Sequence, residues 1–323
     1  MPANHELNIP VDVISKTELA KDIFQFELQP RNDIDLPPPE AGAHIYVEVP
    51  NGEVRRYSLS QSPEVNDRYI ICVKREDNGE GGSKSLCDDS KIGTVLKISE
   101  PTNDFALTGN PTRYIFIAGG IGITPIYSMI QTLNITGEKP YKLYYLTRQK
   151  EATAYLEEFQ DVRYKGKVVI HHTNGDSDNR YDLWPVLEQA KGAYVYCCGP
   201  RELMEEVKDM TGHWSPSSVH FEDFSGAVAH KPDDQPFNLK IADDGKVVRV
   251  EAEQTMMEAL RLNGYEVPSS CESGTCGTCR SKLLSGEADH RDLVLSEAEQ
   301  EKQIIICVSR AMGSDIEIEL PRF

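Results

Sequence analysis

The sequence has no long apolar run. No stretch approaches the about 18 consecutive apolar residues that a membrane-spanning helix needs. The first residues, MPANHELNIP, also lack the basic and apolar regions of a secretory signal peptide. We therefore expect a cytoplasmic protein with no membrane segment. A chain of 323 residues is long enough for two or three domains of about 100–200 residues each.

Positive charge is scarce. Lysine and arginine number 34 against 52 aspartate and glutamate, which gives a net charge of −18. Such a surface repels the phosphates of nucleic acids and anionic membranes. We therefore expect no nucleic-acid or membrane partner, and a protein partner with a basic patch would suit this charge.

Residues 8–108 favour short β-strands. Runs of β-branched and aromatic residues alternate with turn residues such as Asn51-Gly52, which is typical of an antiparallel barrel or sandwich. The runs are VDVIS, IFQFEL, HIYVEV, VRRYSLS, RYIICVK and VLKIS.

Residues 111–228 have a different pattern, in which strands and helices alternate. Four apolar runs, YIFIA, KLYYLT, KVVIHH and AYVYCC, are separated by helix-like stretches near 151–159 and 183–190 and after Pro200. The run PIYSMIQTLN has helical spacing, and Pro125 suits its first position. This alternation predicts a parallel sheet with helices on both faces.

The last part of the chain follows the polar segment 229–236, which we interpret as a linker. Residues 237–323 then contain strand-like runs and one helix-like stretch, 255–263. The predicted domains are 1–108, 109–228 and 237–323.

Four cysteines have the spacing of a metal centre. Cys271-x4-Cys276-x2-Cys279 is followed 27 residues later by Cys307, which is the plant-type [2Fe–2S] ferredoxin pattern. Gly274 and Gly277 permit the tight loop that such a cluster needs. The fourth ligand would come from a distant strand, and Cys307 in IIICVS fits. Zinc and a disulfide remain alternatives, although structural zinc prefers two paired C-x2-C units and only one is present.

Two glycine turns follow apolar strands. Gly119-Gly120-Ile121-Gly122 precedes a helix, a context in which glycine turns bind a dinucleotide pyrophosphate. The match is incomplete because Pro125 stands where the fingerprint has glycine or alanine, so a plain packing turn remains possible. Cys198-Gly199-Pro200 ends a later strand, and both turns would then border one crevice.

A third group of candidate binding residues lies in the β-rich segment. Arg55-Arg56-Tyr57-Ser58 is followed by Gly81-Gly82-Ser83. The second stretch is not a P-loop, because Ser83 stands where glycine must precede the lysine. Glycine amides and Arg55 could still bind a phosphate, and Tyr57 could lie against an aromatic ring. Each element by itself is equally typical of a solvated strand face.

Together and in this order, RRYSLS, GGS, GGIGITP, CGP and the four cysteines resemble the phthalate dioxygenase reductase family. That family is a branch of the ferredoxin–NADP reductase superfamily, and the resemblance covers essentially the whole chain. It implies an antiparallel β-barrel flavin domain, an α/β parallel-sheet nucleotide domain and an α+β plant-type ferredoxin domain. The implied cofactors are FMN, NADH and a [2Fe–2S] cluster.

The resemblance also implies roles for single residues. Arg55, Tyr57 and Ser58 would hold the flavin, with Arg56 beside them contributing mainly its backbone. The backbone of Cys72, Val73 and Lys74 would line the isoalloxazine, and Gly81, Gly82 and Ser83 would cap the phosphate. Gly120, Gly122, Pro125, Gly199 and Pro200 would shape the nicotinamide site. Thr124, Phe224 and Cys198 are the expected catalytic residues, with Phe224 covering the flavin face that nicotinamide must enter.

The implied reaction passes electrons from NADH to FMN, then to the cluster and to a separate protein. We expect that protein to be a Rieske non-haem iron oxygenase that acts on an aromatic or related substrate. Arg148 lies where a 2′-phosphate could bind, but we favour NADH over NADPH. The alternatives are a reductase for a cytochrome P450 or another oxygenase, a non-enzymatic ferredoxin-type carrier and a zinc-stabilised interaction protein. A monomer is expected.

Overall fold

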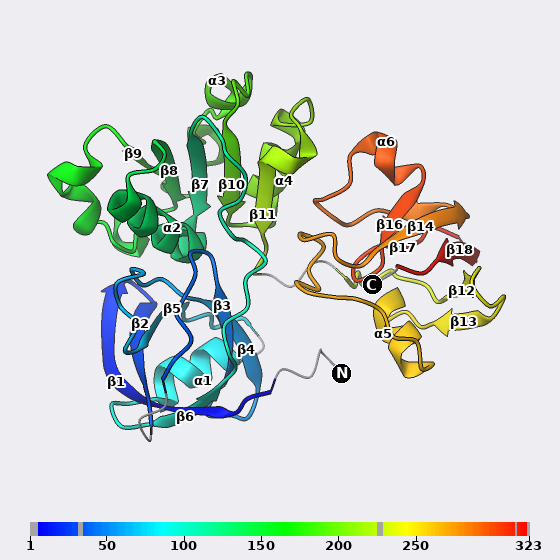
Figure 1. Ribbon diagram of the computed structural model, residues 1–323, viewed down its shortest axis with the longest axis horizontal. Helices are drawn as coiled ribbons and strands as arrows, with labels where there is room; N and C mark the ends of the chain where they lie inside the picture. Colours follow the sequence, from blue (N-terminus) through cyan, green and yellow to red (C-terminus); the bar gives the residue numbers. More distant parts are fainter. Residues whose placement is uncertain (1–5, 32–34, 80, 225–228, 314, 322–323) are drawn as a thin grey trace. The chain divides into compact units, whose positions relative to one another are not determined.

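The computed structural model describes residues 6–31, 35–79, 81–224, 229–313 and 315–321. The chain forms two compact units (Figure 1). One extends to Leu203 and includes Ser218–His220, and the other contains Met204–Ser217 and the chain from Phe221 onward. Within the described ranges, we find no helix with the length and apolar character to cross a membrane. The predicted boundary at residue 228 lies outside the described residues.

The β-rich segment forms an antiparallel sheet in the order β4-β3-β6-β1-β2-β5. Its strands are β1 (Ile9–Ala20), β2 (Ile23–Pro30), β3 (His44–Glu48), β4 (Val54–Ser58), β5 (Tyr69–Lys74) and β6 (Val95–Ile98). The sheet closes where Leu59, just after β4, bridges to Ile71 on β5. Alternate side chains such as Val11 and Val13 are fully buried inside. The barrel prediction is therefore confirmed.

Helix α1 (Gly82–Asp89) lies between β5 and β6 in the chain. Its last turn is held by Lys16 of β1, whose ammonium donates to the carbonyls of Cys87 and Ser90. A cation at this end satisfies helix carbonyls that have no intrahelical partner. The beginning of α1, by contrast, has no side-chain cap.

The second sheet has the order β11-β10-β7-β8-β9. Its strands are β7 (Tyr114–Gly119), β8 (Tyr141–Thr147), β9 (Val168–His172), β10 (Tyr194–Cys198) and β11 (Val219–Glu222). Strands β10, β7, β8 and β9 pair in parallel, which confirms the parallel-sheet prediction. All six residues of β7 are buried, as expected for a central parallel strand. Helix α2 (Ile123–Thr136) packs against β7, β8 and β10.

The helix predictions for this segment are only partly correct. Helix α4 (Arg201–Met210) follows Pro200 as expected, but 183–190 contains only α3 (Trp184–Leu187). The predicted helix near 151–159 is wrong: the structure has 3-10 turns at Lys150–Ala152 and Glu158–Gln160. Tyr155 between them has φ 58°, a left-handed conformation that no α-helix continues through.

The predicted position of Pro125 is also wrong. A 3-10 turn, Gly120–Gly122, leads into α2, which begins at Ile123, so Pro125 is its third residue rather than its first. Proline is still tolerated there, because the first four N–H groups of a helix have no intrahelical acceptor.

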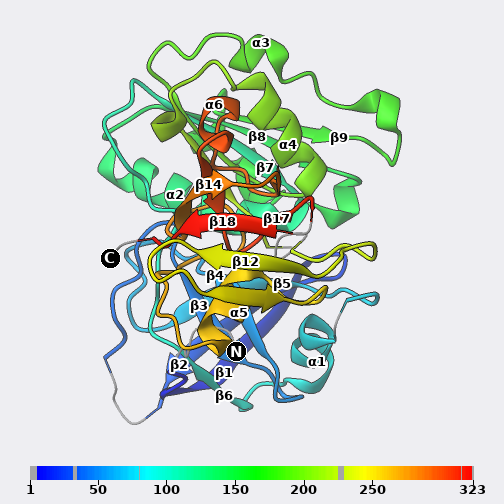
Figure 2. The same ribbon diagram turned by 90° about the vertical axis from the view of Figure 1, so that its right-hand side faces the viewer.

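The C-terminal sheet has the order β13-β12-β18-β14-β16. Its strands are β12 (Phe237–Ile241), β13 (Val247–Val250), β14 (Arg280–Ser285), β16 (Gln303–Ile305) and β18 (Asp315–Glu319), and β15 (Ala288–Asp289) pairs with β17 (Arg310–Ala311). Figure 2 shows β12 beside β18, with which it pairs in parallel. The predicted helix is present as α5 (Met256–Leu262), and a short helix, α6 (Glu297–Gln300), follows the cysteine loop.

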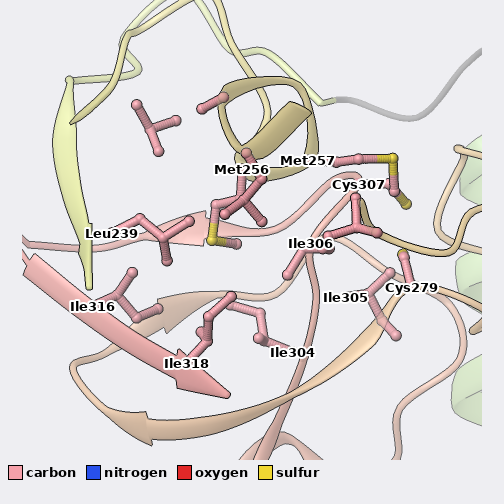
Figure 3. Packing of buried hydrophobic residues seen from close by; sticks show 14 of the residues in the cluster. Leu239, Met256, Met257, Cys279, Ile304, Ile305, Ile306, Cys307, Ile316 and Ile318 are labelled. Atoms are coloured by element: carbon pink, nitrogen blue, oxygen red, sulfur yellow. The ribbon is translucent and has the colours of Figure 1, made fainter. Parts of the chain in front are cut away.

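The core of this unit has Leu239, Ile316 and Ile318 at one side and Cys279 and Cys307 at the other (Figure 3). Helix α5 begins with a reciprocal capping box between Thr255 and Glu258 and buries Met256, Met257, Ala259 and Leu260. The cysteines therefore lie next to a rigid, well-packed element.

The segment 229–236, predicted to be a linker, has no helix or strand. It is anchored on the compact unit that contains the chain from Phe221 onward, here called the C-terminal unit. Asp234 pairs with Arg291 and Arg310, and all three side chains are at least nine-tenths buried. Arg291 also donates to the carbonyl of Ala229 at 2.9 Å, and Lys231 pairs with Asp289 at 3.0 Å. The end of this segment thus belongs to the folded C-terminal unit. The exact domain boundaries stay a prediction.

Substitution of Asp234 tests this anchor. We expect Asp234→Asn to lower the free energy of unfolding by about 3–5 kcal/mol, because two buried guanidinium groups lose their counter-charge. Burial alone would raise the pKa of Asp234, but hydrogen bonds from Arg291 and from the Lys231 amide outweigh it and lower the pKa to about 2. The charged form therefore stabilises the fold above the unfolded pKa of 3.8, and this stabilisation is lost as the pH falls toward 2.

Urea unfolding at pH 7 and pH 3, followed by circular dichroism, measures both effects. The matched control is Asp233→Asn, which changes the same charge at an exposed neighbouring position. Equal unfolding midpoints for Asp234→Asn and Asp233→Asn would contradict the anchor.

Candidate functional site

Arg55 and the beginning of α1 form a cradle in the barrel. A Cβ placed on Gly82 would lie 2.6 Å from Nε of Arg55, so a side chain there would displace Arg55 from this position. Gly81, the residue before the helix, has φ 101°, a conformation that favours glycine. The structure thus brings together the arginine and the glycine pair that the sequence predicted to act jointly, with Ser83 in the first turn of α1.

A carboxylate already occupies this cradle. Oε2 of Glu53 accepts a hydrogen bond from Nη2 of Arg55 at 2.7 Å and lies 3.0 Å from a Cβ built on Gly82. The carboxylate therefore lies between a guanidinium and the uncapped beginning of a helix. Both features attract anions, so the cradle has the chemistry of a phosphate site.

Tyr57 supplies a further sign of a ligand. Its hydroxyl is buried without a hydrogen-bond partner among the described residues. Burial, and after it the nearby Cys87, raises the pKa of Tyr57, so this hydroxyl is neutral. A buried hydroxyl without a partner is costly and is satisfied by a bound polar group. Ser58, next on β4, is buried, and strand alternation places it with Arg56 on the face opposite to Tyr57.

Strand β5 carries the residues expected along a flavin ring. Cys72 and Val73 are buried, and the exposed Lys74 pairs with Glu76. The Cys72 sulfur lies 2.7 Å from the Tyr155 hydroxyl, and the Tyr155 ring stacks on Tyr127 at 3.9 Å. Burial raises the pKa of Cys72 to about 11, so its thiol is protonated and unreactive. These contacts join the barrel to the parallel-sheet segment within the same unit.

The two glycine turns lie against each other, because β7 and β10 are parallel neighbours. A Cβ on Gly122 would lie 2.2 Å from the carbonyl oxygen of Cys198, and one on Gly199 would lie 2.8 Å from Cα of Gly119. Close backbone packing thus explains why Gly122 and Gly199 have no side chain. Gly120 differs: it has φ 54° and nothing within 4 Å of a Cβ position, so it borders open space.

The other predicted nucleotide residues lie next to these two turns or at the same edge of the sheet. Thr124 and Pro125 lie in the first turn of α2, which has no side-chain cap, and the Thr124 hydroxyl donates to the carbonyl of Ile121 at 3.1 Å. Pro200 follows Gly199, and Arg148 is exposed just after β8. Because parallel strands end at one edge, Arg148 shares this edge with both turns.

Phe224 follows β11 and is 38% exposed. It belongs to the second compact unit. Its predicted place over the flavin stays a prediction.

The four predicted cysteine ligands form two thiol pairs. In the first pair, a hydrogen bond from the Cys276 thiol lowers the pKa of Cys271 to about 4, and the pKa of Cys276 is raised. In the second pair, a hydrogen bond from the Cys307 thiol lowers the pKa of Cys279, and the pKa of Cys307 is raised. No three described His, Cys, Asp or Glu side chains converge on a point that one metal ion could occupy. Four cysteine thiols in two neighbouring pairs fit the ligand set of a [2Fe–2S] cluster.

The cysteine loop, from Cys271 to Cys279, has a backbone shape that suits cluster binding. The amides of Ser273 and Cys276 point at the Cys271 sulfur at 3.4 and 3.3 Å. A Cβ on Gly274 would lie 2.8 Å from Cγ2 of Val308. Amides aimed at ligand sulfurs stabilise negative charge on a bound cluster. One expectation was wrong: Cys307 lies in the turn after β16 rather than on the strand.

Sequence reasoning missed several residues of these sites. Glu53 precedes Arg55 by two positions, so strand alternation could have placed both on one face. No local sequence pattern indicates Tyr155 or Arg261. Each contacts a residue elsewhere in the chain, Cys72 for Tyr155 and Glu272 in the cysteine loop for Arg261. Two open hollows, of about 580 Å³ near Tyr155 and about 540 Å³ near Arg261, do not coincide with the predicted cofactor sites.

Three family models match the chain. Residues 10–106 match the oxidoreductase FAD-binding domain, 116–209 the oxidoreductase NAD-binding domain and 239–312 the 2Fe-2S iron-sulfur cluster binding domain. The chain therefore carries a flavin domain, a nicotinamide domain and an iron–sulfur domain, in that order.

Similar proteins share this organisation over nearly their full length. The chain is 48% identical to a phthalate 4,5-dioxygenase oxygenase reductase subunit of Pseudomonas putida, over 95% of both chains. It is 45% identical to a phthalate dioxygenase reductase of Burkholderia cepacia, over 95% of this chain and 96% of that one. A solved phthalate dioxygenase reductase, described as a modular structure for electron transfer from pyridine nucleotides to [2Fe–2S], superposes with a TM-score of 0.69 and 44% identity over 97% and 98% of the chains.

A solved type IV self-sufficient cytochrome P450 monooxygenase is also similar. It shares 32% identity with a TM-score of 0.72, and the match covers 97% of this chain but 41% of that one.

The close packing of the two turns gives a testable prediction. Gly122→Ala should weaken NADH binding at least about tenfold, because the methyl group would push the Cys198 carbonyl and the start of α2 apart. We also expect a loss of about 1–3 kcal/mol in stability, as for other overpacked sites. Titration with NADH measures the first effect and urea unfolding the second.

Gly212→Ala is the matched control, because a Cβ there meets only ordinary contacts of 3.6 Å or more. An unchanged NADH affinity in Gly122→Ala would show that the crevice does not bind the nucleotide.

Proposed function

The chain belongs to the phthalate dioxygenase reductase family, and from this premise we propose that it passes electrons from NADH through FMN and a [2Fe–2S] cluster to a separate Rieske-type oxygenase. The oxygenase would act on an aromatic or related substrate. The relatives include reductase subunits of several oxygenase systems, which supports an oxygenase as the partner. We further propose a cytoplasmic monomer with domains 1–108, 109–228 and 237–323.

The observation that carries this proposal is the cradle of Arg55, Gly82 and Tyr57. It offers a guanidinium, a helix start without a side-chain cap and a buried hydroxyl that has no hydrogen-bond partner in the described part of the chain, which together suit a phosphate-bearing ring compound. When bound, a flavin supplies the exchange between two-electron hydride chemistry and the one-electron chemistry of the cluster. The chain needs no acid, base or nucleophile of its own for this.

The residues around each group then have separate tasks. Arg55, Gly81, Gly82 and Ser83 bind the phosphate, and Tyr57 and Ser58 hydrogen-bond the flavin. The rigid backbone of Cys72, Val73 and Lys74 orients the ring. Thr124 and Cys198 shape the place where nicotinamide meets flavin, and Phe224 covers it until nicotinamide binds.

We propose NADH as the electron donor. Arg148 is exposed at the edge where the adenosine half would lie, and Lys150 follows it two positions later in the chain. An arginine there can accommodate a 2′-phosphate, but the match of residues 116–209 to the oxidoreductase NAD-binding domain supports NADH. Gly120, Gly122, Pro125, Gly199 and Pro200 would form the crevice around the rest of the nucleotide.

A second candidate acceptor is a cytochrome P450. The similar region of the self-sufficient monooxygenase is 32% identical to nearly all of this chain. The family premise, with 45–48% identity to phthalate dioxygenase reductases, favours the Rieske oxygenase.

Spectroscopy with one ligand variant tests the electron path. NADH should bleach the flavin absorption of the wild type and produce the electron paramagnetic resonance signal of a reduced [2Fe–2S] cluster. In Cys307→Ser, flavin bleaching should persist while transfer to an added oxygenase falls by at least about 100-fold, because a cluster ligand is lost. Cys197→Ser, a change at a buried cysteine outside the cluster loop, is the control and should retain transfer.

Each alternative predicts a different result. A ferredoxin-type carrier would show no flavin absorption, and a zinc-stabilised protein would contain zinc without iron or labile sulfide. Turnover with a cytochrome P450 but with no Rieske oxygenase would establish the second candidate.

Glu53 gives a prediction for flavin affinity. Its carboxylate lies where a phosphate would bind, so Glu53→Gln should tighten FMN binding about tenfold. Two like charges about 4 Å apart repel by about 1 kcal/mol even in water, and by more near protein. Fluorescence quenching during FMN titration measures the affinity.

Riboflavin, which lacks the phosphate, should bind both forms equally. Glu48→Gln is the matched control, since Glu48 pairs with Lys97 on neighbouring strands of the same barrel. Weaker FMN binding in Glu53→Gln would mean instead that Glu53 orients Arg55 for the phosphate.

A further inference from the structure

Glu272 has an unfavourable backbone conformation. It lies in the cysteine loop, directly after Cys271, with φ 49°. Gly274 and Gly277 in the same loop also have positive φ, but glycine adopts it without a steric penalty. For a glutamate this conformation is strained and persists only where surrounding contacts hold it.

Two polar groups hold Glu272. Its Oε1 accepts a hydrogen bond from Nη2 of Arg261 at 2.8 Å and another from the Ser269 hydroxyl at 2.8 Å. Arg261 donates to Ser269 as well, which closes a three-membered network. The Arg261 and Glu272 side chains are only 23% and 28% exposed, so water screens this ion pair less than a surface pair.

Arg261 is a firm anchor for the loop. It is the sixth of seven residues in α5, a helix with a capping box at its beginning and four residues buried in the core. Its neighbour Leu260 is fully buried. The network therefore ties the loop to a helix that is capped and packed into the core.

The conformation of Glu272 decides where the next amide points. The Ser273 N–H is directed at the Cys271 sulfur at 3.4 Å, and the Cys276 N–H at 3.3 Å. If residue 272 relaxed to the right-handed region that glutamate prefers, the following peptide would turn and the Ser273 amide would leave the sulfur. The loop would then no longer present Cys271 with its stabilising amides.

We propose that Arg261 is a positioning residue that holds the loop from Cys271 to Cys279 in its cluster-binding form by fixing the left-handed conformation of Glu272. This inference rests on the proposed binding of the cluster by Cys271, Cys276, Cys279 and Cys307. It also means that Oε1 of the Glu272 carboxylate is engaged within the unit.

A double-mutant cycle tests the proposal on the purified full-length protein. Cluster loss is followed by visible circular dichroism after addition of an iron chelator. Arg261→Ala should accelerate the loss about tenfold. Glu272→Gly should lose the cluster no faster than wild type, because glycine adopts positive φ without a tether. In the Glu272→Gly background, Arg261→Ala should then have no further effect.

The control is Lys240→Ala. Lys240 and Glu317 form an ion pair of 2.9 Å on neighbouring strands of the same unit, outside the cysteine loop. Its removal should leave the rate of cluster loss unchanged. Thermal unfolding of each variant separates general destabilisation from a local effect, and Arg261→Gln, which keeps the side-chain stem, replaces Arg261→Ala if the latter does not fold.

Three results would overturn the proposal. An unchanged loss rate in Arg261→Ala would show that the network does not matter. Equal acceleration by Arg261→Ala in both backgrounds would show that Arg261 acts through α5 rather than through Glu272. If neither Glu272→Gly nor Glu272→Asn assembled a cluster, the carboxylate would have more than a conformational role, which also contradicts the proposal. A wild type without any cluster signal would instead refute the proposed ligation before any variant is compared.

Discussion

The close approach of backbone to neighbouring groups at glycine is the constraint on which all three sites depend. Gly82 lies against Arg55, Gly122 against the carbonyl of Cys198, and Gly274 against Val308, each with no room for a Cβ. Cofactors are bound largely by main-chain amides and helix starts in such sites, and these groups are accessible only where side chains are absent. One steric rule therefore shapes the flavin cradle, the nucleotide crevice and the cluster loop.

Arginine–carboxylate pairs act as the second organising element. Asp234 anchors residues 229–236 to the C-terminal unit through Arg291 and Arg310. Glu53 satisfies Arg55 in the cradle, and Glu272 is held by Arg261 in the cluster loop. The chain is strongly acidic, with a net charge of −18, yet these few arginines are placed where a carboxylate or a phosphate must be held in one orientation.

Much of the fold could be predicted because its signals are local. The six barrel strands, the parallel strands β7 to β10 and helix α5 all follow from alternating or helical apolar patterns. The helix predictions that were wrong also have local causes, which the apolar pattern does not reveal. Tyr155 takes a left-handed conformation that ends any helix near 151–159, and a 3-10 turn shifts the start of α2 relative to Pro125. Neither conformation can be inferred from residue type, since tyrosine rarely adopts the first and glycine permits many alternatives to the second.

The sequence by itself, through its motifs and the family resemblance that they carry, indicated which kinds of cofactor the chain can hold. The cysteine spacing and the order of the glycine and arginine motifs are properties of contiguous chain, and their chemistry follows from residue type and spacing. Only the tertiary structure decided which carboxylate meets which arginine at distances along the chain of up to 76 positions, as for Asp234 with Arg310. It also decided that Tyr155 reaches Cys72 and that Arg261 holds Glu272. Such pairs depend on how separate elements pack, so no local pattern encodes them.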